Sequence, residues 1–342
     1  MSGAPDEIRV AGAFVVSLLI TLAATPWAWR LALRMGLLDH PVGYKAHRSS
    51  TPYLGGAAVL AGILATLLLF GVADDFRVLV ASALILFAIG TLDDRIGLGV
   101  FPRLLPQVLI AVALWEVNLG WTIVDADVPN LLLTIVWVVG ITNAFNLMDN
   151  LDGAAGTVAS VSTAGAGALA LTQGDAGLAV VAFAVSGACA GFLPYNLARP
   201  AKIFLGDGGS MPLGVFVACT IMAVPDGTLD WTLLFASAPL AGLAILDTAL
   251  VVISRYRRGA TILSGARDHL THRLLSGLGS ERRVALTLAV SQAALCGLAL
   301  GLHELDPEGV IAAAAVYLAL GAAAIALLET AAFAPPRAER SA

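Results

Sequence analysis

The sequence predicts an all-α integral membrane protein with about eleven transmembrane helices, and three observations support this fold class. Hydrophobic residues make up 58% of the 342 residues and charged residues only 13%, which is about half the charged share of a soluble domain. Apolar windows of roughly 17 to 25 residues, the length that spans a bilayer, recur along the whole chain. Lys and Arg residues fall in alternate loops between these windows.

The predicted helices follow one another with no long polar segment between them. The first apolar run, from Ile8 to Trp29, exceeds the roughly 7 to 15 apolar residues of a signal-peptide core, so we expect it to remain as the first span. We place the helices near residues 10–32, 54–71, 77–92, 103–118, 130–147, 154–172, 177–194, 210–224, 231–253, 284–302 and 309–329. We therefore expect one polytopic domain over residues 1–333 and a short cytoplasmic tail over 334–342.

Basic residues orient the chain, because the cytoplasmic loops of membrane proteins carry an excess of Lys and Arg. All of the 19 Lys and Arg residues except Arg9 and Arg77 fall on one side of the predicted helices. The loops on the opposite side carry acids such as Asp74, Asp125 and Asp306. The sequence thus predicts that the N-terminus lies outside the cell and the C-terminus in the cytoplasm.

Polar motifs gather in the loops that this orientation assigns to the cytoplasm. The first inner loop contains Lys45 and ends in a Gly-Gly pair at a helix start, where backbone can approach a ligand closely. The second begins with Asp93 and Asp94 at the end of a span. Acids so near hydrocarbon usually mark an ion or substrate path. If both carboxylates are ionised, a cationic group should lie nearby.

The third inner loop is the most informative, and it reads Asn143-Ala-Phe-Asn146-Leu-Met-Asp149-Asn-Leu-Asp152-Gly. A spacing of three places Asn143 and Asn146 on one helical face, and Asp149 and Asp152 continue the series. A turn this short does not need two amides and two carboxylates to form. We therefore expect the four side chains to converge on one site.

The fourth inner loop places small residues around an acid directly before a helix, in the sequence Phe204-Leu-Gly-Asp207-Gly-Gly-Ser210. Such a helix start suits a phosphate and Mg²⁺ held beside backbone N–H groups. Ser210 can equally serve as a helix N-cap. The sequence therefore predicts a phosphate or metal site here.

The last inner loop carries Arg267, His269, His272 and Arg273. The two histidines would face the same way on a helix, beside the arginines. This array suits a pyrophosphate better than zinc, which takes more His or Cys ligands. Asp247 lies within the preceding span, and membrane anchoring does not explain it.

Together the inner loops supply acids for a divalent metal and cations for phosphates. Mg²⁺ takes one or two carboxylates together with phosphate oxygens and water, so we expect Mg²⁺, with Mn²⁺ as the alternative ion. The expected substrates are a phosphorylated cytosolic metabolite and an acceptor in the membrane. The sequence has neither a Walker-type loop nor a His-Glu-x-x-His motif, so ATP coupling and zinc proteolysis are not expected. No nucleic-acid partner is expected either.

These motifs resemble the polyprenyl-phosphate N-acetylhexosamine-1-phosphate transferases, and the resemblance runs from Asp39 to Arg273 in family order. It implies transfer of a sugar 1-phosphate, with N-acetylglucosamine favoured, from a UDP-sugar to undecaprenyl or another polyprenyl phosphate. UMP is released and Mg²⁺ is used, in the first membrane step of cell-envelope polysaccharide synthesis. The resemblance also implies a bacterial cytoplasmic membrane protein whose active site faces the cytoplasm.

The same resemblance implies a role for each matching residue. Asp207 and Asp149 are the expected metal ligands, and Phe204 is expected to stack on uracil. The expected catalytic residues are Asp93, Asp94, Asp149, Asp152, His269 and His272, and the expected nucleotide-binding residues are Lys45, Asn143, Asn146, Asn196, Phe204 and Arg267. Two positions depart from the family pattern, since Thr271 stands where many members have His and Asn150 where Gly is common.

Two alternatives remain open at this stage. The first is the phospho-MurNAc-pentapeptide transferase of the same family, against which stand the short loops and the form of the His269 motif. The second is an ion-coupled transporter, which predicts acids near the membrane midplane or along both access routes rather than at one face. The pattern of the CDP-alcohol phosphotransferases is not found. Association as a homodimer is also left open.

Overall fold

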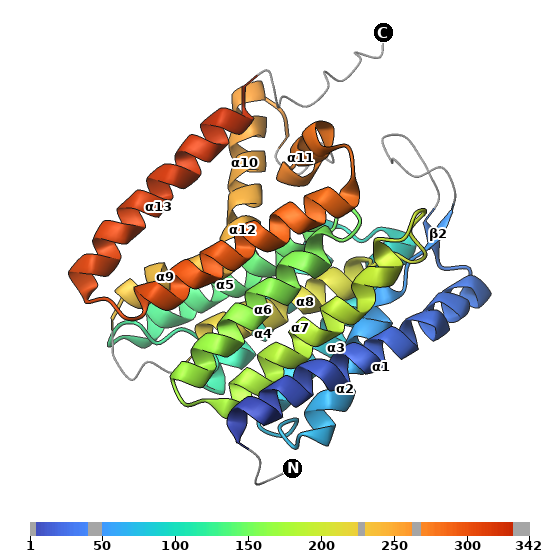
Figure 1. The fold of residues 1–342 in the computed structure, drawn as a ribbon, viewed down its shortest axis with the longest axis horizontal. Helices are drawn as coiled ribbons and strands as arrows, with labels where there is room; N and C mark the ends of the chain where they lie inside the picture. Colours follow the sequence, from blue (N-terminus) through green and yellow to red (C-terminus); the bar gives the residue numbers. More distant parts are fainter. Residues whose placement is uncertain (1–4, 40–49, 225–229, 262–267, 331–342) are drawn as a thin grey trace.

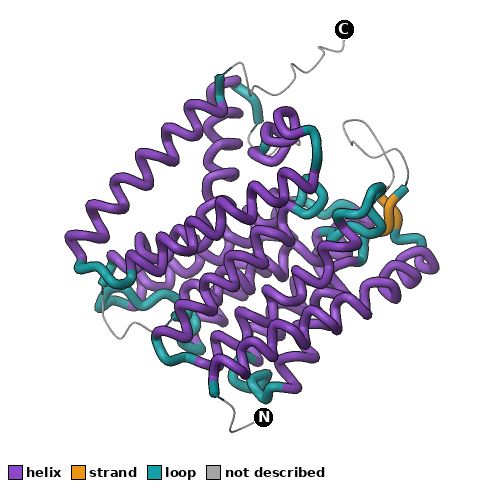
Figure 2. Tube along the Cα trace, in the orientation of Figure 1, coloured by secondary structure: helices purple, strands orange, loops and turns teal. Residues whose placement is uncertain are grey.

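A computed structural model describes residues 5–39, 50–224, 230–261 and 268–330, and most of them are helical (Figures 1 and 2). In chain order the elements are α1 (Asp6–Met35), β1 (Leu38–Asp39), β2 (Thr51–Pro52), α2 (Gly55–Leu69), α3 (Arg77–Ile96), α4 (Val100–Glu116), α5 (Asp127–Met148), α6 (Ala154–Thr172), α7 (Ala176–Asn196), α8 (Asp207–Met222), α9 (Thr232–Ser237), η1 (Ala238–Ala241), α10 (Gly242–Arg258), α11 (Leu270–Leu278), α12 (Glu281–Leu302) and α13 (Pro307–Leu328). The antiparallel β1–β2 pair, in which Leu38 pairs with Pro52, is a small exception to an all-α fold.

Helices occupy all of the predicted ranges, and the structure supports a multi-pass membrane protein. Within the described residues, seven helical segments are long and apolar enough to cross a membrane, and α2 and α8 are apolar but shorter. The seven are α1, α5, α6, α7, the segment from α9 to α10, α12 and α13. The expected total of about eleven spans stays a prediction.

The ninth predicted helix, over residues 231–253, is not one regular helix. It consists of α9, a short 3₁₀ turn and α10, which continues to Arg258. Pro239 lies in the turn and has no backbone N–H to donate, which explains the interruption. The sequence analysis also did not predict α11 as a separate element.

The interior of the bundle is built around α6, α7 and α8. Helix α7 packs against α1 and α6, and α8 packs against α3 and α5. Glycines bring α7 close to α1, since a Cβ on Gly187 would lie 2.1 Å from the carbonyl oxygen of Phe14. Such close approach is typical of helix pairs inside membranes. Helix α13 lies at the edge of the bundle (Figure 1), and most of its side chains are exposed.

The start of α8 is held tightly between α2 and α3. A Cβ on Gly90 of α3 would lie 2.3 Å from the backbone oxygen of Asp207, and one on Gly56 of α2 would lie 2.4 Å from the Cα of Gly209. The backbone N–H of Gly56 donates to the carbonyl just before α8, at Leu205. Because larger residues do not fit here, the glycines fix the position from which Asp207 projects.

Candidate functional site

Asp207, the first residue of α8, is the centre of a polar cluster formed by three further helices. Asn146 Nδ2 of α5 donates to Asp207 Oδ1 at 2.8 Å and to Ser210 Oγ at 3.1 Å. Arg103 Nη1 of α4 lies 3.8 Å from Asp207 Oδ2 and donates to Asp93 Oδ2 of α3 at 2.9 Å. Arg103 is therefore the cation that the Asp93–Asp94 pair required. In the sequence, Arg103 had served only as one of the basic residues that predict which loops are cytoplasmic.

The two adjacent acids of α3 have different surroundings. Asp93 is buried, and its carboxylate accepts hydrogen bonds from Arg103 and from the backbone N–H five residues later. Asp94 Oδ2 accepts from the backbone N–H of Gly208 at 3.3 Å, in the first turn of α8. Gly206 has a φ of +75°, and a Cβ there would lie 2.7 Å from Asp94 Oδ2. Asp93 thus braces α4, whereas Asp94 lies at the positive end of the α8 dipole.

Asp149 and Asp152 lie just beyond α5, which ends at Met148. Burial raises the pKa of Asp149 well above its ordinary value, and the charges of Asp207 and Asp94 raise it further. Burial, followed by the charge of Glu281, raises the pKa of Asp152 to about 7. Asp149 therefore belongs to the acidic cluster around Asp207, while Asp152 is influenced by the start of α12.

Asn143 does not share the contacts of Asn146. Its Nδ2 donates to Gln107 Oε1 of α4 at 2.6 Å and to the Val139 carbonyl at 2.8 Å. This contact lies about one helical turn from the Arg103 and Asn146 contacts on α4 and α5. The structure thus brings Asn146 and Asp149 to Asp207, but it does not bring Asn143 there.

The donor set of the acidic cluster fits Mg²⁺. In the described parts of the chain, no group of three or more His, Cys, Asp or Glu side chains is arranged to hold a metal by itself. Mg²⁺ does not require such a group, because phosphate oxygens and water complete its coordination. The carboxylates of Asp149 and Asp207 are close enough to raise the pKa of Asp149. A divalent cation would relieve this repulsion.

Asp247 is a buried carboxylate that the sequence flagged without assigning a role. Its Oδ2 lies 2.9 Å from His269 Nδ1, and its Oδ1 accepts from the backbone N–H of Leu270 at 2.6 Å. Asp247 in α10 therefore holds the first turn of α11 and fixes the plane of the His269 ring. Within the described residues, no hydrogen bond engages the other ring nitrogen, Nε2. The ring centroids of His269 and His272 are 6.5 Å apart.

The two positions that depart from the family pattern are in contact. Thr271 Oγ1 of α11 donates to Asn150 Oδ1, which lies in the turn between Asp149 and Asp152. This hydrogen bond joins the histidine helix to the acidic loop. The sequence contained a signal for it, because two departures in different loops suggest that one compensates for the other.

Several arginines near α11 are engaged inside the protein. Arg255 is buried and donates to both oxygens of Asp268, at 3.0 and 2.9 Å, and Arg258 donates to the same carboxylate at 2.6 Å. Burial raises the pKa of Asp268, but the hydrogen bonds and charge of Arg255 outweigh it, so the pKa lies below its ordinary value. Arg273 donates to Glu329 at 2.7 Å at the end of α13. These arginines therefore hold α10, α11 and the end of α13 together through paired charges, and we call this arrangement the basic scaffold.

Asn196 ties two loops of the site together. Its Oδ1 accepts from the backbone N–H of Gly153 at 2.7 Å, and its Nδ2 donates to the Ile203 carbonyl at 3.1 Å. The buried amide is therefore used by the protein itself. Phe204 is half-buried and packs beside Tyr53. The remaining predicted nucleotide-binding residues, Lys45 and Arg267, lie outside the described residues.

Comparison with known proteins agrees with this geometry. The model of glycosyl transferase family 4 matches residues 76–224, which include the acidic cluster. The chain is 33% identical to a probable undecaprenyl-phosphate N-acetylglucosaminyl 1-phosphate transferase of Bacillus subtilis, over 82% of this chain and 81% of the relative. It is 33% identical to a decaprenyl-phosphate N-acetylglucosaminephosphotransferase of Mycolicibacterium smegmatis, over 82% and 79% of the two chains. It is 28% identical to the undecaprenyl-phosphate alpha-N-acetylglucosaminyl 1-phosphate transferase of Escherichia coli K12, over 83% and 82%. With this extent of similarity, the chain belongs to glycosyl transferase family 4.

Proposed function

We propose that this protein transfers N-acetylglucosamine 1-phosphate from its UDP derivative to undecaprenyl or another polyprenyl phosphate, with release of UMP. The observation that carries the proposal is the half-buried cluster of Asp94, Asp149 and Asp207 beside Arg103, which the Asn150–Thr271 contact joins to the histidine helix. The names of the relatives supply the sugar and the lipid class. They do not favour the phospho-MurNAc-pentapeptide alternative.

The reaction asks the protein mainly to position two phosphates and to neutralise their charge. An oxygen of the acceptor phosphate attacks the phosphorus that bears the sugar, and a new P–O–P bond forms. The bond from that phosphorus to the UMP oxygen breaks, and UMP leaves with the electron pair. Because a phosphate monoester has a second pKa near 6, much of the acceptor is already dianionic at neutral pH, so the reaction does not require a strong base.

Asp207 and Asp149 would hold Mg²⁺, which when bound neutralises charge on the phosphates. Asn146 keeps the Asp207 carboxylate oriented through its hydrogen bond. Asp94, at the start of α8, is the better placed of the two α3 acids to meet the acceptor. Asp93 instead holds Arg103, whose guanidinium also lies beside Asp207. His269, oriented by Asp247, and His272 would contact the diphosphate.

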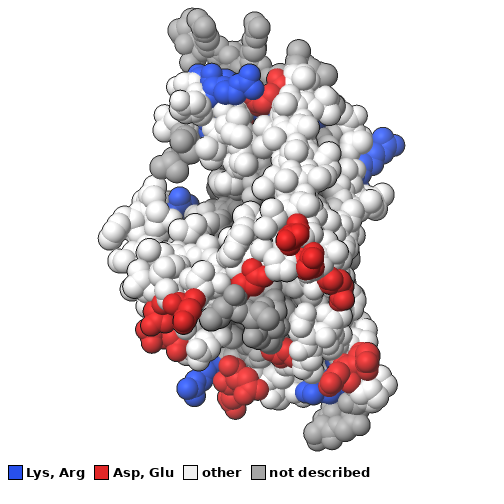
Figure 3. Space-filling model, turned by 90° about the vertical axis from the view of Figure 1, so that its left-hand side faces the viewer, with Lys and Arg blue, Asp and Glu red and all other residues white. Residues whose placement is uncertain are grey.

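For the membrane topology we propose about eleven spans, with the N-terminus outside, the C-terminus in the cytoplasm and the site on the cytoplasmic side. The charge distribution supports this orientation. On the face in Figure 3, most of the acidic side chains lie in the lower half together with smaller basic groups, and a larger basic group lies at the upper end. An excess of basic residues marks the cytoplasmic side. The lower end is the end at which α1 begins (Figure 1).

The test uses the purified full chain in nanodiscs with undecaprenyl phosphate, Mg²⁺ and a panel of UDP-sugars, and it measures UMP release. We expect UMP to appear with UDP-N-acetylglucosamine and to require both the lipid phosphate and the metal. UMP release with UDP-MurNAc-pentapeptide alone would assign the protein to the alternative substrate. If no sugar in the panel yields UMP, the transferase proposal is wrong.

A further inference from the structure

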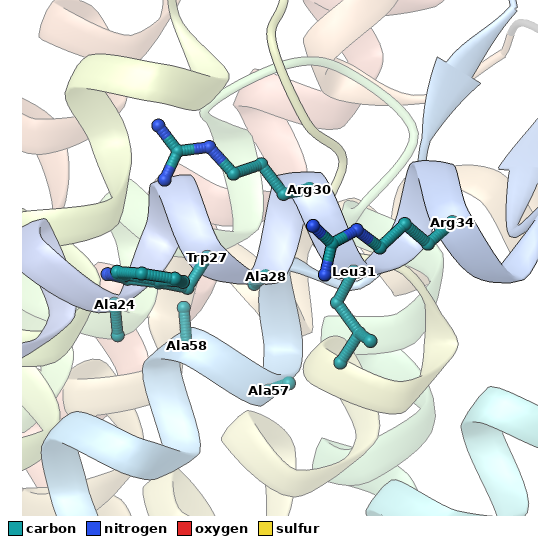
Figure 4. Close-up of a pocket in the computed structure, with 8 residues that line it drawn as sticks. All are labelled: Ala24, Trp27, Ala28, Arg30, Leu31, Arg34, Ala57 and Ala58. Atoms are coloured by element: carbon teal, nitrogen blue, oxygen red, sulfur yellow. The ribbon is translucent and has the colours of Figure 1, made fainter.

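A groove on the protein surface lies between the second half of α1 and the first turn of α2. It has a volume of about 350 Å³ and is lined by Ala24, Trp27, Ala28, Arg30, Leu31, Arg34, Ala57 and Ala58. Figure 4 shows the Trp27 ring beside Ala58 of α2 and Leu31 toward Ala57, with Arg30 extending from α1 on the side away from these alanines. The four alanines leave space that larger side chains would fill. The two helices themselves pack closely one turn away, where Gly62 meets Thr21.

The rim of the groove is cationic and aromatic. The Arg30 guanidinium lies 5.3 Å from the centroid of the Trp27 ring, and the Trp27 side chain is 70% exposed. Arg34 follows one helical turn later and is also exposed. Among the described residues, neither arginine forms an ion pair with a carboxylate. The groove thus combines an apolar floor with two guanidinium groups that can bind an anion.

The length of α1 places this rim at the membrane surface. A helix of 30 residues is about 45 Å long, which exceeds the roughly 30 Å of a hydrocarbon core. If the apolar part of α1 spans the core from its start, its last turns lie among the lipid head groups. Trp and Arg are both enriched at this level. The amphipathic groove is therefore positioned to hold a head group above and the start of an acyl chain below.

We propose that this groove binds an anionic phospholipid, with its phosphate held by Arg30 and Arg34 and its glycerol region packed against Trp27 and the alanines. Charge complementarity selects an anionic lipid over phosphatidylcholine, whose head group carries a compensating positive charge. The acceptor lipid phosphate is a less suitable occupant. None of the acids or histidines of the candidate site lines the groove, so a phosphate held there is not presented to a reacting group.

The proposal is tested with the full chain in nanodiscs of equimolar phosphatidylcholine and phosphatidylglycerol, followed by gentle extraction and native mass spectrometry. The wild-type protein should retain phosphatidylglycerol in clear excess over phosphatidylcholine. The Arg30→Gln/Arg34→Gln variant should lose this preference, by about fivefold per arginine, since each basic residue near the surface contributes on the order of 1 kcal/mol. Ala24→Leu should lose it too, because the new side chain fills the groove without changing its charge.

Arg257→Gln is the matched control, because Arg257 is exposed beside Tyr256, which is 80% exposed, but it does not line the groove. This variant should retain phosphatidylglycerol like the wild type. Equal loss in the control, or a wild-type protein with no preference, would show diffuse surface attraction and overturn the proposal. Displacement of phosphatidylglycerol by undecaprenyl phosphate would also overturn it, by identifying a different occupant. UMP release in the same nanodiscs is a separate readout, so failure here leaves the transferase proposal standing.

Discussion

The candidate site has an acidic half, formed by Asp93, Asp94, Asp149, Asp152 and Asp207, and a basic half, formed by His269 and the arginines near α11. Charged groups are paired within the protein in the basic half but largely unpaired in the acidic half. On the basic side, charged groups are paired within the protein: Arg255 with Asp268, Arg273 with Glu329, and His269 with Asp247. On the acidic side, the charges of Asp207 and Asp94 raise the pKa of Asp149, and Arg103 is the cation that lies beside Asp93 and Asp207 in the described structure. The charges of the basic half are therefore paired within the protein, whereas the acidic half keeps a repulsion that the proposed Mg²⁺ would relieve.

This difference predicts different consequences of removing one charge. In the basic half, loss of one partner leaves the other buried and unpaired, which typically destabilises a protein by about 3 to 5 kcal/mol. In the acidic half, loss of the Asp149 or Asp207 carboxylate removes repulsion, so the fold should be unharmed while activity suffers. Measuring stability and activity for the same variants therefore tests the comparison directly.

Asp207→Asn should have the largest effect on activity. Asparagine keeps the shape of the side chain and removes the charge that would bind the metal, so UMP release should fall on the order of 10³-fold. The unfolding temperature should stay the same or rise, because the repulsion from neighbouring acids is relieved. Differential scanning fluorimetry and the UMP assay together measure both effects.

Asp125→Asn is the control, because Asp125 is an exposed acid in the loop just before α5 begins. This variant should change neither UMP release nor the unfolding temperature. A large loss of stability in Asp207→Asn would contradict the view that the acidic half is strained without its ligand. So would near-normal activity with unchanged Mg²⁺ dependence.

Asp247→Asn should rank second in its effect on activity and first in its effect on stability. Its carboxylate accepts from the Leu270 N–H and holds His269, and a hydrogen bond to a charged group contributes about 1.5 to 3 kcal/mol. Loss of this positioning should lower kcat roughly 10- to 100-fold, with a smaller effect on the KM for the acceptor lipid. Steady-state kinetics with each substrate varied measures this split.

Asp247→Glu restores the charge and should recover part of kcat. If Asp247→Glu and Asp247→Asn are equally impaired in kcat and equally unstable, Asp247 only supports packing. A stable and fully active Asp247→Asn variant would contradict the view that the pairs of the basic half stabilise the protein.

The sequence predicted the helices far better than the contacts inside the site, for physical reasons. Helix positions follow from the length of apolar segments, which can be read from the sequence. The prediction therefore placed α6 at its observed bounds, Ala154–Thr172. The break at Pro239 was missed because the surrounding residues stay apolar. The end of α5 was predicted within one residue of Met148, but Asn143 was grouped with Asp152 because a spacing of three does not show which residues of a face reach the site and which contact a neighbouring helix, as Asn143 does with Gln107 of α4.

Partners across the bundle were the least predictable part. Arg103 could be recognised as the cation for Asp93 only after α4 was folded back on α3, since ten residues separate them in sequence. Asp247 and His269 are 22 residues apart and meet only because α11 turns back toward α10. The acids of the site could be predicted from the sequence, but the partner of each acid could be identified only from the structure.

The Asn150–Thr271 hydrogen bond links the two halves, and it should have an intermediate effect. Asn150→Ala and Thr271→Val should each lower kcat/KM for the UDP-sugar by roughly fivefold, because a typical hydrogen bond contributes about 1 kcal/mol. The double variant should be little worse than Asn150→Ala alone, which removes the shared bond and also the hydrogen bond from Asn150 Nδ2 to the Leu147 carbonyl. Independent, multiplying losses would show that the contact does not couple α11 to the acidic loop.

Asp152 offers the smallest and most specific test of the acidic half, through the pH dependence of stability. Its pKa in the folded protein is about 7, above the value of about 3.9 in an unfolded chain. Between these values the folded protein binds more protons than the unfolded chain, so Asp152 makes stability fall as pH rises and the loss is complete above the folded pKa. The unfolding temperature of the wild type should therefore drop more between about pH 5 and about pH 8 than that of Asp152→Asn. Glu281→Gln should reduce the slope partly, because the Glu281 charge adds to the effect of burial. Parallel slopes in the wild type and Asp152→Asn would mean that Asp152 is solvated like an ordinary surface acid, and the strained region would then be limited to the carboxylates around Asp207.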